Sequence, residues 1–349
     1  MSGKIRSYCY LRVAACLAIV LLHTANISEL LHRDAITVAQ RAHAMGIVYC
    51  MMWAVPVFIM VSGALLLDPA RHVTMKRIMT RYVKRVFLAL ISCCILFALF
   101  DMVMNKERFS LMFIPDGIYR MFTGGSWAHL WYLYMLLGLY LMLPFGRILA
   151  RRVKDRELLY LMGIIAVVVS VLPLSELFGF GSAFELPVAS IYPFYFFAGY
   201  AVASGRVKIS RHIAWAMAAG GTLVILIAVI VQFQYFPADD SVLAPLTARY
   251  SALPVVLQSV GIFSLAVGGE EKEWDLPAWL VRLLAIFDEC GFGIYLLHMV
   301  ILRLLLRYME WDLFLVGGWS FYVLPLGVYF ASCVAVWLLK KIPYVNTVL

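Results

Sequence analysis

Charged residues are scarce in this chain. Asp, Glu, Lys and Arg together make up 14% of its 349 residues, whereas 64% are hydrophobic and the mean hydropathy is +0.90. A soluble domain carries about 25% charged and about 45–50% apolar residues. A core of this size cannot hide such an apolar excess, because surface area falls too slowly relative to volume. The composition excludes a soluble enzyme, a disulfide-stapled secreted domain and a disordered chain, and it predicts a protein solvated by lipid.

The sequence also lacks the motifs of metal and disulfide sites. Its seven cysteines form no C-x-x-C pair and no cluster with histidine, so neither a zinc site nor a disulfide framework is expected. They fall in or beside apolar runs, where small thiols usually fill space. No internal repeat, low-complexity run or soluble appendage is visible, so residues 1–349 are expected to form one membrane-embedded domain without a metal.

Ten apolar runs are candidates for membrane spans. A spanning helix needs about 20 predominantly apolar residues. The runs predict an all-α, polytopic integral membrane helix bundle of about ten transmembrane helices. They lie near 8–28, 47–67, 86–104, 128–146, 158–174, 188–204, 213–234, 249–267, 288–308 and 318–339. The fifth and sixth runs are short, and Gly, Ser and Pro mark the stretch between them at 175–187.

The basic residues fall mostly on one side of these predicted spans. If the N-terminus is cytoplasmic, 20 of the 29 Lys and Arg residues lie in inner segments and 8 in outer ones. This positive-inside bias predicts that both termini are cytoplasmic. It also accounts for the net charge of +9 without a nucleic-acid partner.

The first predicted span contains two ionisable residues, Arg12 and His23. Such side chains are costly inside a span and usually face the bundle interior or a cavity. The two are eleven residues apart, which is three helical turns plus about 20°, so both lie on one helix face about 16 Å apart along the axis. A guanidinium at the cytoplasmic end can hold phosphate, and a deeper imidazole can take a proton near neutral pH. This pattern favours a path for a phosphorylated donor.

Each of these residues also has a purely structural explanation. Arg12 can snorkel to lipid headgroups, and His23 can hydrogen-bond a neighbouring helix. Glu29 is six residues beyond His23, about 240° around the helix, so it faces elsewhere. A group that orients His23 must therefore come from another span.

Several segments, in order along the chain, resemble the acyltransferase-3 family of integral membrane acyltransferases. Arg12 and His23 resemble the Arg/His pair of the family's first span. Residues 55–63 (VPVFIMVSG) resemble its second-span motif, 129–133 (HLWYL) its fourth-span motif, and 293–298 (GIYLLH) its late motif. The compact sugar O-acetyltransferases of surface glycans, such as that of the enterobacterial common antigen, are the subgroup that the chain resembles.

The resemblance implies transfer of an acyl group, usually acetyl from acetyl-CoA, to a hydroxyl of a cell-envelope saccharide or lipid-linked glycan at the bacterial inner membrane. It implies that His23 is essential and that Arg12 is its partner. Acyl transfer needs a base for the hydroxyl and cationic or hydrogen-bonding groups for the oxyanion, which agrees with these residue types. Both roles for His23, general base and covalent acyl carrier, stay open.

Polar and aromatic residues in the other motifs are candidate substrate contacts. They are Ser62, His129, Trp131, Tyr132, Tyr295 and His298. The aromatic residue at 131 can stack on a sugar and the histidine at 129 can hydrogen-bond it. Each candidate has a structural alternative: close helix packing at the Ser-Gly pair of residues 62–63, an interfacial aromatic belt at 131–132, and an interhelical hydrogen bond at 295 and 298.

The segment 71–85 is rich in basic residues. It is typical of a helix that lies on an anionic inner leaflet. The alternative is that it attracts the phosphates of CoA through Arg77, Arg81 and Arg85.

Two other classes of function compete with acyl transfer. Ten spans with buried ionisable residues also suit a secondary transporter, although the paired repeats and interrupted spans typical of transporters are not visible. A non-catalytic assembly factor would tolerate substitution of Arg12 and His23. The acceptor, the acyl chain and the formation of a homo-oligomer stay open.

Overall fold

A computed structural model describes residues 3–179, 190–237, 242–267, 276–309, 314–343 and 345–348. Across these residues every regular element is a helix. The chain forms two compact units. Unit 1 comprises Met1–Asp68 and Val153–Ala335, and unit 2 comprises Pro69–Arg152 and Val336–Leu349. Most of the predicted boundary at 175–187, the first residues of the sixth predicted span and the inner Lys272 lie outside the described residues.

Unit 1 holds most of the helices. Their bounds are α1 Gly3–His32, α2 Val38–Cys50, α3 Ala54–Leu66, α8 Asp155–Ala166, the π-helical η3 Val167–Val171, the 3-10 segment η4 Leu172–Phe178, α9 Ile191–Ala203, α10 Arg211–Tyr235, α11 Ala244–Thr247, α12 Leu253–Val267 and α13 Ala278–Tyr308. The helix α14, Trp319–Leu339, begins in unit 1 and ends in unit 2.

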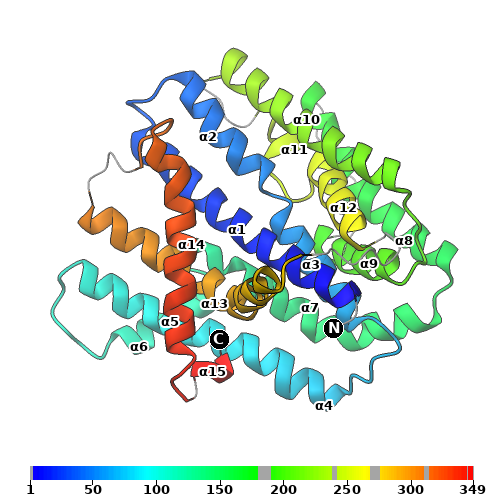
Figure 1. Cartoon of the computed structure of the whole chain (residues 1–349), viewed down its shortest axis with the longest axis horizontal. Coiled ribbons are helices and arrows are strands. Elements are labelled where there is room, and N and C mark those ends of the chain that lie inside the picture. Colours follow the sequence, from blue (N-terminus) through cyan, green and yellow to red (C-terminus); the bar gives the residue numbers. More distant parts are fainter. Residues whose placement is uncertain are drawn as a thin grey trace. The chain divides into compact units, whose positions relative to one another are not determined.

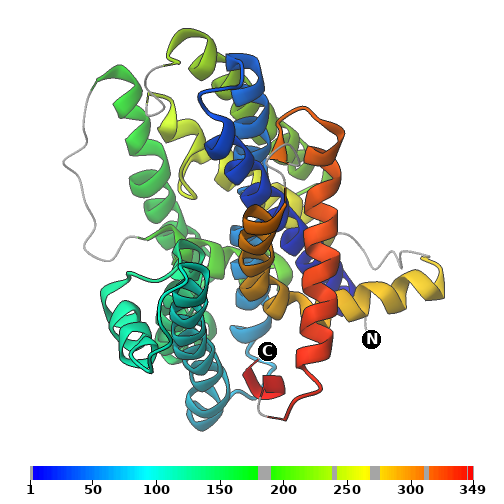
Figure 2. The same cartoon turned by 90° about the vertical axis from the view of Figure 1, so that its left-hand side faces the viewer.

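The helix α1 lies at the centre of unit 1 and packs against α2, α3, α12 and α13 (Figure 1). Its buried face is made of small and aliphatic residues such as Ala15, Ile19 and Val20, which are at most 3% exposed. Figure 2 shows α13, in orange, beside α1 in blue. The central position of α1 places its ionisable residues among other helices.

The packing of α3 on α9 depends on two glycines. A Cβ atom at Gly63 would lie 1.8 Å from the carbonyl oxygen of Phe196, and one at Gly199 would lie 2.0 Å from that of Met60. Only residues without a side chain permit this approach of two backbones. The packing interpretation of the Ser-Gly pair at 62–63 is therefore confirmed for the glycine.

Unit 2 is a smaller helical cluster. Its elements are α4 Met75–Arg77, the π-helical η1 Ile78–Val83, α5 Lys84–Met104, α6 Phe113–Thr123, the 3-10 turn η2 Ala128–Leu130, α7 Trp131–Arg152 and α15 Val345–Val348. The helix α5 packs against α6 and α7. At Gly117, an added Cβ atom would come within 2.5 Å of the Ile95 backbone, so this glycine permits the close contact of α6 with α5.

The prediction of an all-helical, multi-pass membrane protein is confirmed, but the count of ten spans is not. Among the described residues, eight helical segments are long and apolar enough to cross a membrane. They are Arg6–His32, Val38–Leu66, Met75–Met104, Ala128–Arg152, Asp155–Phe178, Arg211–Tyr235, Ala278–Tyr308 and Trp319–Leu339. The helices α9 and α12 have 13 and 15 residues, fewer than the roughly 20 that a span needs. The orientation of the termini stays a prediction.

The basic segment is continuous with the third candidate span. Residues 75–104 form one helical segment of 30 residues, in which the basic turns lead directly into the apolar ones. Such a segment is about 45 Å long, whereas the hydrocarbon core is about 30 Å thick. The basic residues therefore lead without a break into a helix long enough to span a membrane, and their position on the inner leaflet stays a prediction.

Candidate functional site

The helices α1 and α13 lie side by side in parallel and in register. Four pairs join them, and the α13 member of each is 275 or 276 positions further along the chain. The pairs are Cys9 with Leu284, Arg12 with Asp288, Cys16 with Gly291, and His23 with His298. Arg12 and His23 thus both face α13, which agrees with the spacing argument that placed them on one helix face.

The contact between α1 and α13 is called the seam below. At one end of the seam, Arg12 binds Asp288 through two charge-assisted hydrogen bonds. Its Nε and Nη2 atoms donate to Oδ1 and Oδ2 of Asp288, each at 2.6 Å. The side chains are 29% and 16% exposed, so the pair is partly accessible. Bidentate geometry fixes the guanidinium and adds specificity. The pair therefore sets the register of α1 against α13.

Further along the seam, His23 lies against His298. The centroids of the two rings are 5.2 Å apart, with the planes tilted by 39°. His298 is fully buried, and its Nδ1 lies 3.2 Å from the carbonyl oxygen of Ile294. Because a carbonyl oxygen only accepts, this hydrogen bond requires a proton on Nδ1. The structure thus brings together two imidazoles from two candidate membrane spans, α1 and α13.

Tyr295 and Ser62 complete the predicted site residues of unit 1. The ring of Tyr295 is centred 6.0 Å from that of His298, and Tyr295 is 6% exposed. The hydroxyl of Ser62 donates to the carbonyl oxygen of Phe58, one turn back in α3, at 2.9 Å. Tyr295 therefore lies beside His298 of the histidine pair, whereas the hydroxyl of Ser62 is hydrogen-bonded within α3.

Glu29 takes no part in this seam. Its carboxylate accepts hydrogen bonds from Arg33 at 3.0 and 3.1 Å and from Arg41 at 2.9 Å, and the Glu29 side chain is fully buried. The prediction that Glu29 faces away from His23 agrees with these partners.

In unit 2, His129 lies in an aromatic cluster. Its ring is centred 5.6 Å from that of Phe97 and 6.1 Å from that of Trp127, and it is 2% exposed. The indole nitrogen of Trp127 donates to Asp101 at 3.2 Å, and Arg120 binds the same carboxylate at 3.0 Å. Two aromatic rings thus lie against His129, and one of them is hydrogen-bonded to the Asp101–Arg120 ion pair.

Two of the predicted acceptor contacts follow His129 closely in the sequence. Trp131 and Tyr132 begin α7 with their rings edge to face and their centroids 6.3 Å apart. Tyr132 is 8% exposed.

The hydrogen bond from Arg120 to Asp116, and then the nearby charges of Asp116 and Asp101, raise the pKa of Arg120 despite its partial burial.

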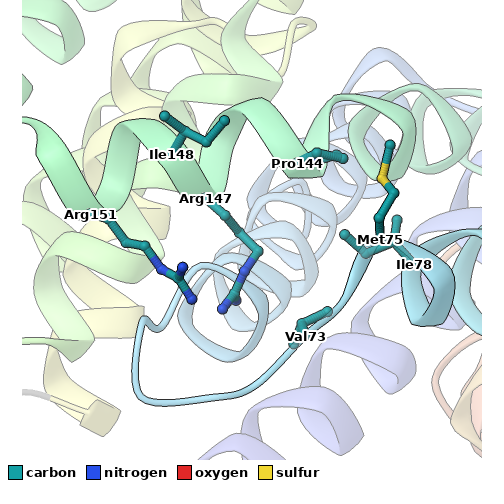
Figure 3. A pocket seen from close by; sticks show the side chains of 7 residues that line it. All are labelled: Val73, Met75, Ile78, Pro144, Arg147, Ile148 and Arg151. Carbon is teal, nitrogen blue, oxygen red and sulfur yellow. The ribbon is translucent and has the colours of Figure 1, made fainter.

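The three arginines predicted to attract CoA phosphates are solvent-exposed. Arg77, Arg81 and Arg85 project from the helical segment 75–104. A cavity of about 180 Å³ in unit 2 is lined instead by Arg147 and Arg151 of α7, together with Val73, Met75, Ile78, Pro144 and Ile148. Figure 3 shows both arginine side chains reaching from α7 toward the loop before α4. Arg147 is 5% exposed and donates to the carbonyl oxygen of Arg71 at 2.6 Å.

The predicted site residues are therefore divided between the units. Arg12, His23, Ser62, Tyr295 and His298 belong to unit 1. His129, Trp131 and Tyr132 belong to unit 2, as do the three exposed arginines.

Sequence reasoning missed Asp288. The predicted ninth span began at that residue, which placed the carboxylate at a membrane boundary. The helix α13 begins ten residues earlier, at Ala278, so Asp288 lies inside a candidate span and opposite Arg12. The available signal was an acidic residue followed by an apolar run, ten positions before a histidine, close to the eleven that separate Arg12 from His23.

The chain also matches a known family. The model of the acyltransferase-3 family, described as an acyltransferase domain, matches residues 6–341. The chain belongs to this family. No curated protein and no solved structure matches it. An acyltransferase-3 domain of this extent takes in both units and every residue of the α1–α13 seam.

Family membership gives the seam its chemical context. A membrane acyltransferase needs groups that move a proton and groups that stabilise an oxyanion. The adjacent imidazoles of His23 and His298 are groups of a kind that can transfer a proton, and the guanidinium of Arg12 is a cation on the same face. Across the described residues, no group of three or more His, Cys, Asp or Glu side chains is arranged to hold a metal ion.

Proposed function

We propose that this protein is an integral membrane O-acyltransferase that moves an acetyl or other short acyl group from acyl-CoA to a hydroxyl of a cell-envelope saccharide. The observation that carries the proposal is the pairing of His23 with His298, in register with the pairing of Arg12 with Asp288. Two imidazoles and an arginine on one seam of an acyltransferase-3 domain suit this chemistry better than a purely structural role.

In the proposed reaction, His23 acts as the general base. Its basic ring nitrogen accepts the proton of the acceptor hydroxyl while the hydroxyl oxygen attacks the thioester carbonyl carbon. The C–S bond then breaks, the acyl ester stays on the acceptor, and the imidazolium returns the proton to the CoA thiolate. His298 lies beside the His23 ring and orients it, which is the role that sequence reasoning assigned to another span.

The proposed donor is acetyl-CoA, and Arg12 is its proposed phosphate contact at the cytoplasmic end of the seam. Asp288 now holds that guanidinium by two bonds, so an incoming phosphate would exchange with the carboxylate. The exposed arginines 77, 81 and 85 would attract the same phosphates by long-range charge, since exposed charges act mainly through the field around them.

The proposed acceptor is a saccharide or lipid-linked glycan of the bacterial cell envelope, and the proposed location is the inner membrane with both termini cytoplasmic. His129, Trp131 and Tyr132 are the proposed acceptor contacts of unit 2. Aromatic faces beside a buried histidine suit a sugar, because a ring stacks on the apolar face while polar atoms hydrogen-bond the hydroxyls. Surface-glycan acetylation, as in the enterobacterial common antigen subgroup, is the proposed biological setting.

The test is transfer of label from acetyl-CoA by the purified protein in proteoliposomes. Envelope glycans from cells that lack the gene serve as the acceptor. We expect labelled acetyl ester on the glycan and release of CoA in equal amounts. Label that stays on CoA, with movement of a solute across the vesicle membrane, would instead establish the transporter alternative.

A further inference from the structure

The helix α6 of unit 2 has a large apolar face on its outward side. Met112, just before the helix, Tyr119 and Phe122 are 69%, 67% and 78% exposed. Their spacing of seven and three residues places them along one side of the helix. Phe109 and Leu111, a few residues earlier, are exposed as well. These five residues are called the outward face below, and contiguous exposed apolar patches of this kind mark contact with protein or lipid.

The opposite side of α6 packs against α5 (Figure 1). Gly117 permits the two backbones to approach, since a Cβ atom there would lie 2.5 Å from the Cα atom of Ile95. The hydroxyl of Tyr134, in the first turn of α7, donates to the carbonyl oxygen of Met121 at 2.6 Å. These contacts fix the position of α6 along α5 and the direction of its outward face.

The contact at Gly117 lies deep along α5. Beyond the basic turns, the predominantly apolar part of this candidate span is 86–104, whose 19 residues are about 29 Å long and match a hydrocarbon core of about 30 Å. Ile95 is the middle residue of this stretch, about 14 Å from Met104. The polar run 105–108 follows directly and marks the membrane surface on this side. At Gly117, α6 therefore lies at the depth of the acyl chains and not of the headgroups.

The helix α6 is too short to cross the membrane. It has 11 residues and is about 16 Å long. The candidate spans on either side of it end at Met104 and begin at Ala128, so the chain enters and leaves on one side. Apolar segments of about 10–14 residues are typical of such re-entrant helices.

The charged side chains of α6 form ion pairs. Arg120 binds Asp116 of the same helix at 2.7 Å and Asp101 of α5 at 3.0 Å. Ionisable groups at membrane depth are costly and usually pair with one another. These pairs lie away from the outward face, which presents apolar side chains alone.

We infer that α6 is a re-entrant membrane helix whose outward face contacts the acyl chains of the leaflet on the side where α5 ends. Water is a poor solvent for so apolar a face. A stable protein–protein interface takes about 20–30 residues from each partner, far more than the five of this face. Lipid is therefore the occupant that fits both its chemistry and its depth.

The test is electron paramagnetic resonance of single nitroxide labels on the full-length protein in phosphatidylcholine vesicles. Labels are attached to Tyr119→Cys and Phe122→Cys on the outward face, and to Arg108→Cys in the polar run. The seven native cysteines are buried, and wild-type protein treated in the same way measures their background. Collisions with oxygen, which concentrates in lipid, are compared with collisions with a water-soluble nickel chelate. We expect the ratio of oxygen to nickel collisions to be several-fold higher at positions 119 and 122 than at 108.

Two outcomes would overturn the inference. A ratio at positions 119 and 122 equal to that at position 108 would place the outward face in water. Protection of both positions from oxygen and nickel alike would show that protein covers the face, as in a dimer formed through α6.

A second measurement needs no substitution. Wild-type protein is photolabelled by a phosphatidylcholine with a diazirine in the middle of its acyl chain, and labelled peptides are mapped by mass spectrometry. Leu96 is an exposed residue of α5, next to Ile95 in depth, so its peptide serves as the internal control. We expect label on residues 109–122 as well as on that peptide. Label on the Leu96 peptide alone would contradict the inference.

Discussion

The two ends of α1 both carry an arginine bound to a carboxylate, but the two contacts are built differently. At one end Arg12 and Asp288 form a one-to-one pair whose side chains are 29% and 16% exposed. At the other end Glu29 is fully buried and shared by Arg33 and Arg41. A buried carboxylate held by two cations is a fixed anchor, because removing either kind of charge leaves the other unpaired. A partly exposed pair can exchange one partner for a ligand.

This comparison explains why the two ends suit different tasks. The Glu29 cluster joins α1 to α2 through Arg41, so it holds the fold. The Arg12–Asp288 pair joins α1 to α13 and places His23 against His298. We therefore expect substitutions in the Glu29 cluster to lower stability and substitutions in the Arg12–Asp288 pair to lower turnover.

The largest effect on stability is expected at the anchor. Glu29→Gln leaves two guanidinium groups around a neutral amide, and loss of one partner of a buried ion pair costs about 3–5 kcal/mol. The lower end of that range applies, because Arg33 is 44% exposed. The free energy of unfolding in detergent measures it. Glu107→Gln, at an exposed loop position, should change it by less than about 0.5 kcal/mol; equal losses would refute the anchor role.

A smaller effect, on kinetics, is expected at the other end. Asp288→Asn weakens the register of α1 on α13 and should lower kcat about tenfold, which corresponds to about 1.4 kcal/mol. It also removes the carboxylate that competes for Arg12, so the KM for acetyl-CoA should fall. A general loss of structure would not lower KM. Glu289→Gln, at the exposed neighbouring position, is the control, and a raised KM in Asp288→Asn would contradict the exchange of partners.

The smallest effect is expected outside the seam. Arg77, Arg81 and Arg85 are exposed at the start of a spanning helix, where screening by salt weakens their attraction for phosphate. Their combined replacement by Gln should raise the KM for acetyl-CoA about threefold at low salt, with kcat unchanged. The difference should vanish at high ionic strength. A salt-independent change in KM would indicate direct contacts instead.

Much of the fold follows from the sequence because membrane spans are local features. The apolar runs located a helix at every one of the ten predicted positions. Two of these helices are short within the described residues, where α9 and α12 have 13 and 15 residues. Gly63 and Gly199 place α9 directly against α3, a contact that depends on which helices are neighbours and not on the hydropathy of either.

For the candidate site, the shared helix face of Arg12 and His23 was predictable, but their pairing with α13 was not. The helical period placed Arg12 and His23 on one face, because their spacing lies within a single helix. Their partners Asp288 and His298 lie 276 and 275 residues away, and that register is set by the packing of two distant helices. Hydropathy also placed the start of the ninth span at Asp288 itself, which hid a carboxylate that α13 carries inside the span.

Acetyl transfer by three histidine variants tests the central claim most directly. His23→Ala and His298→Ala remove the paired imidazoles, and His32→Ala removes another histidine of α1, at its C-terminal end. Loss of a general base lowers the rate about 10²–10⁴-fold, so we expect transfer from labelled acetyl-CoA to fall to that extent in His23→Ala and substantially in His298→Ala. His32→Ala should retain it. Full transfer by a folded His23→Ala protein would contradict the account.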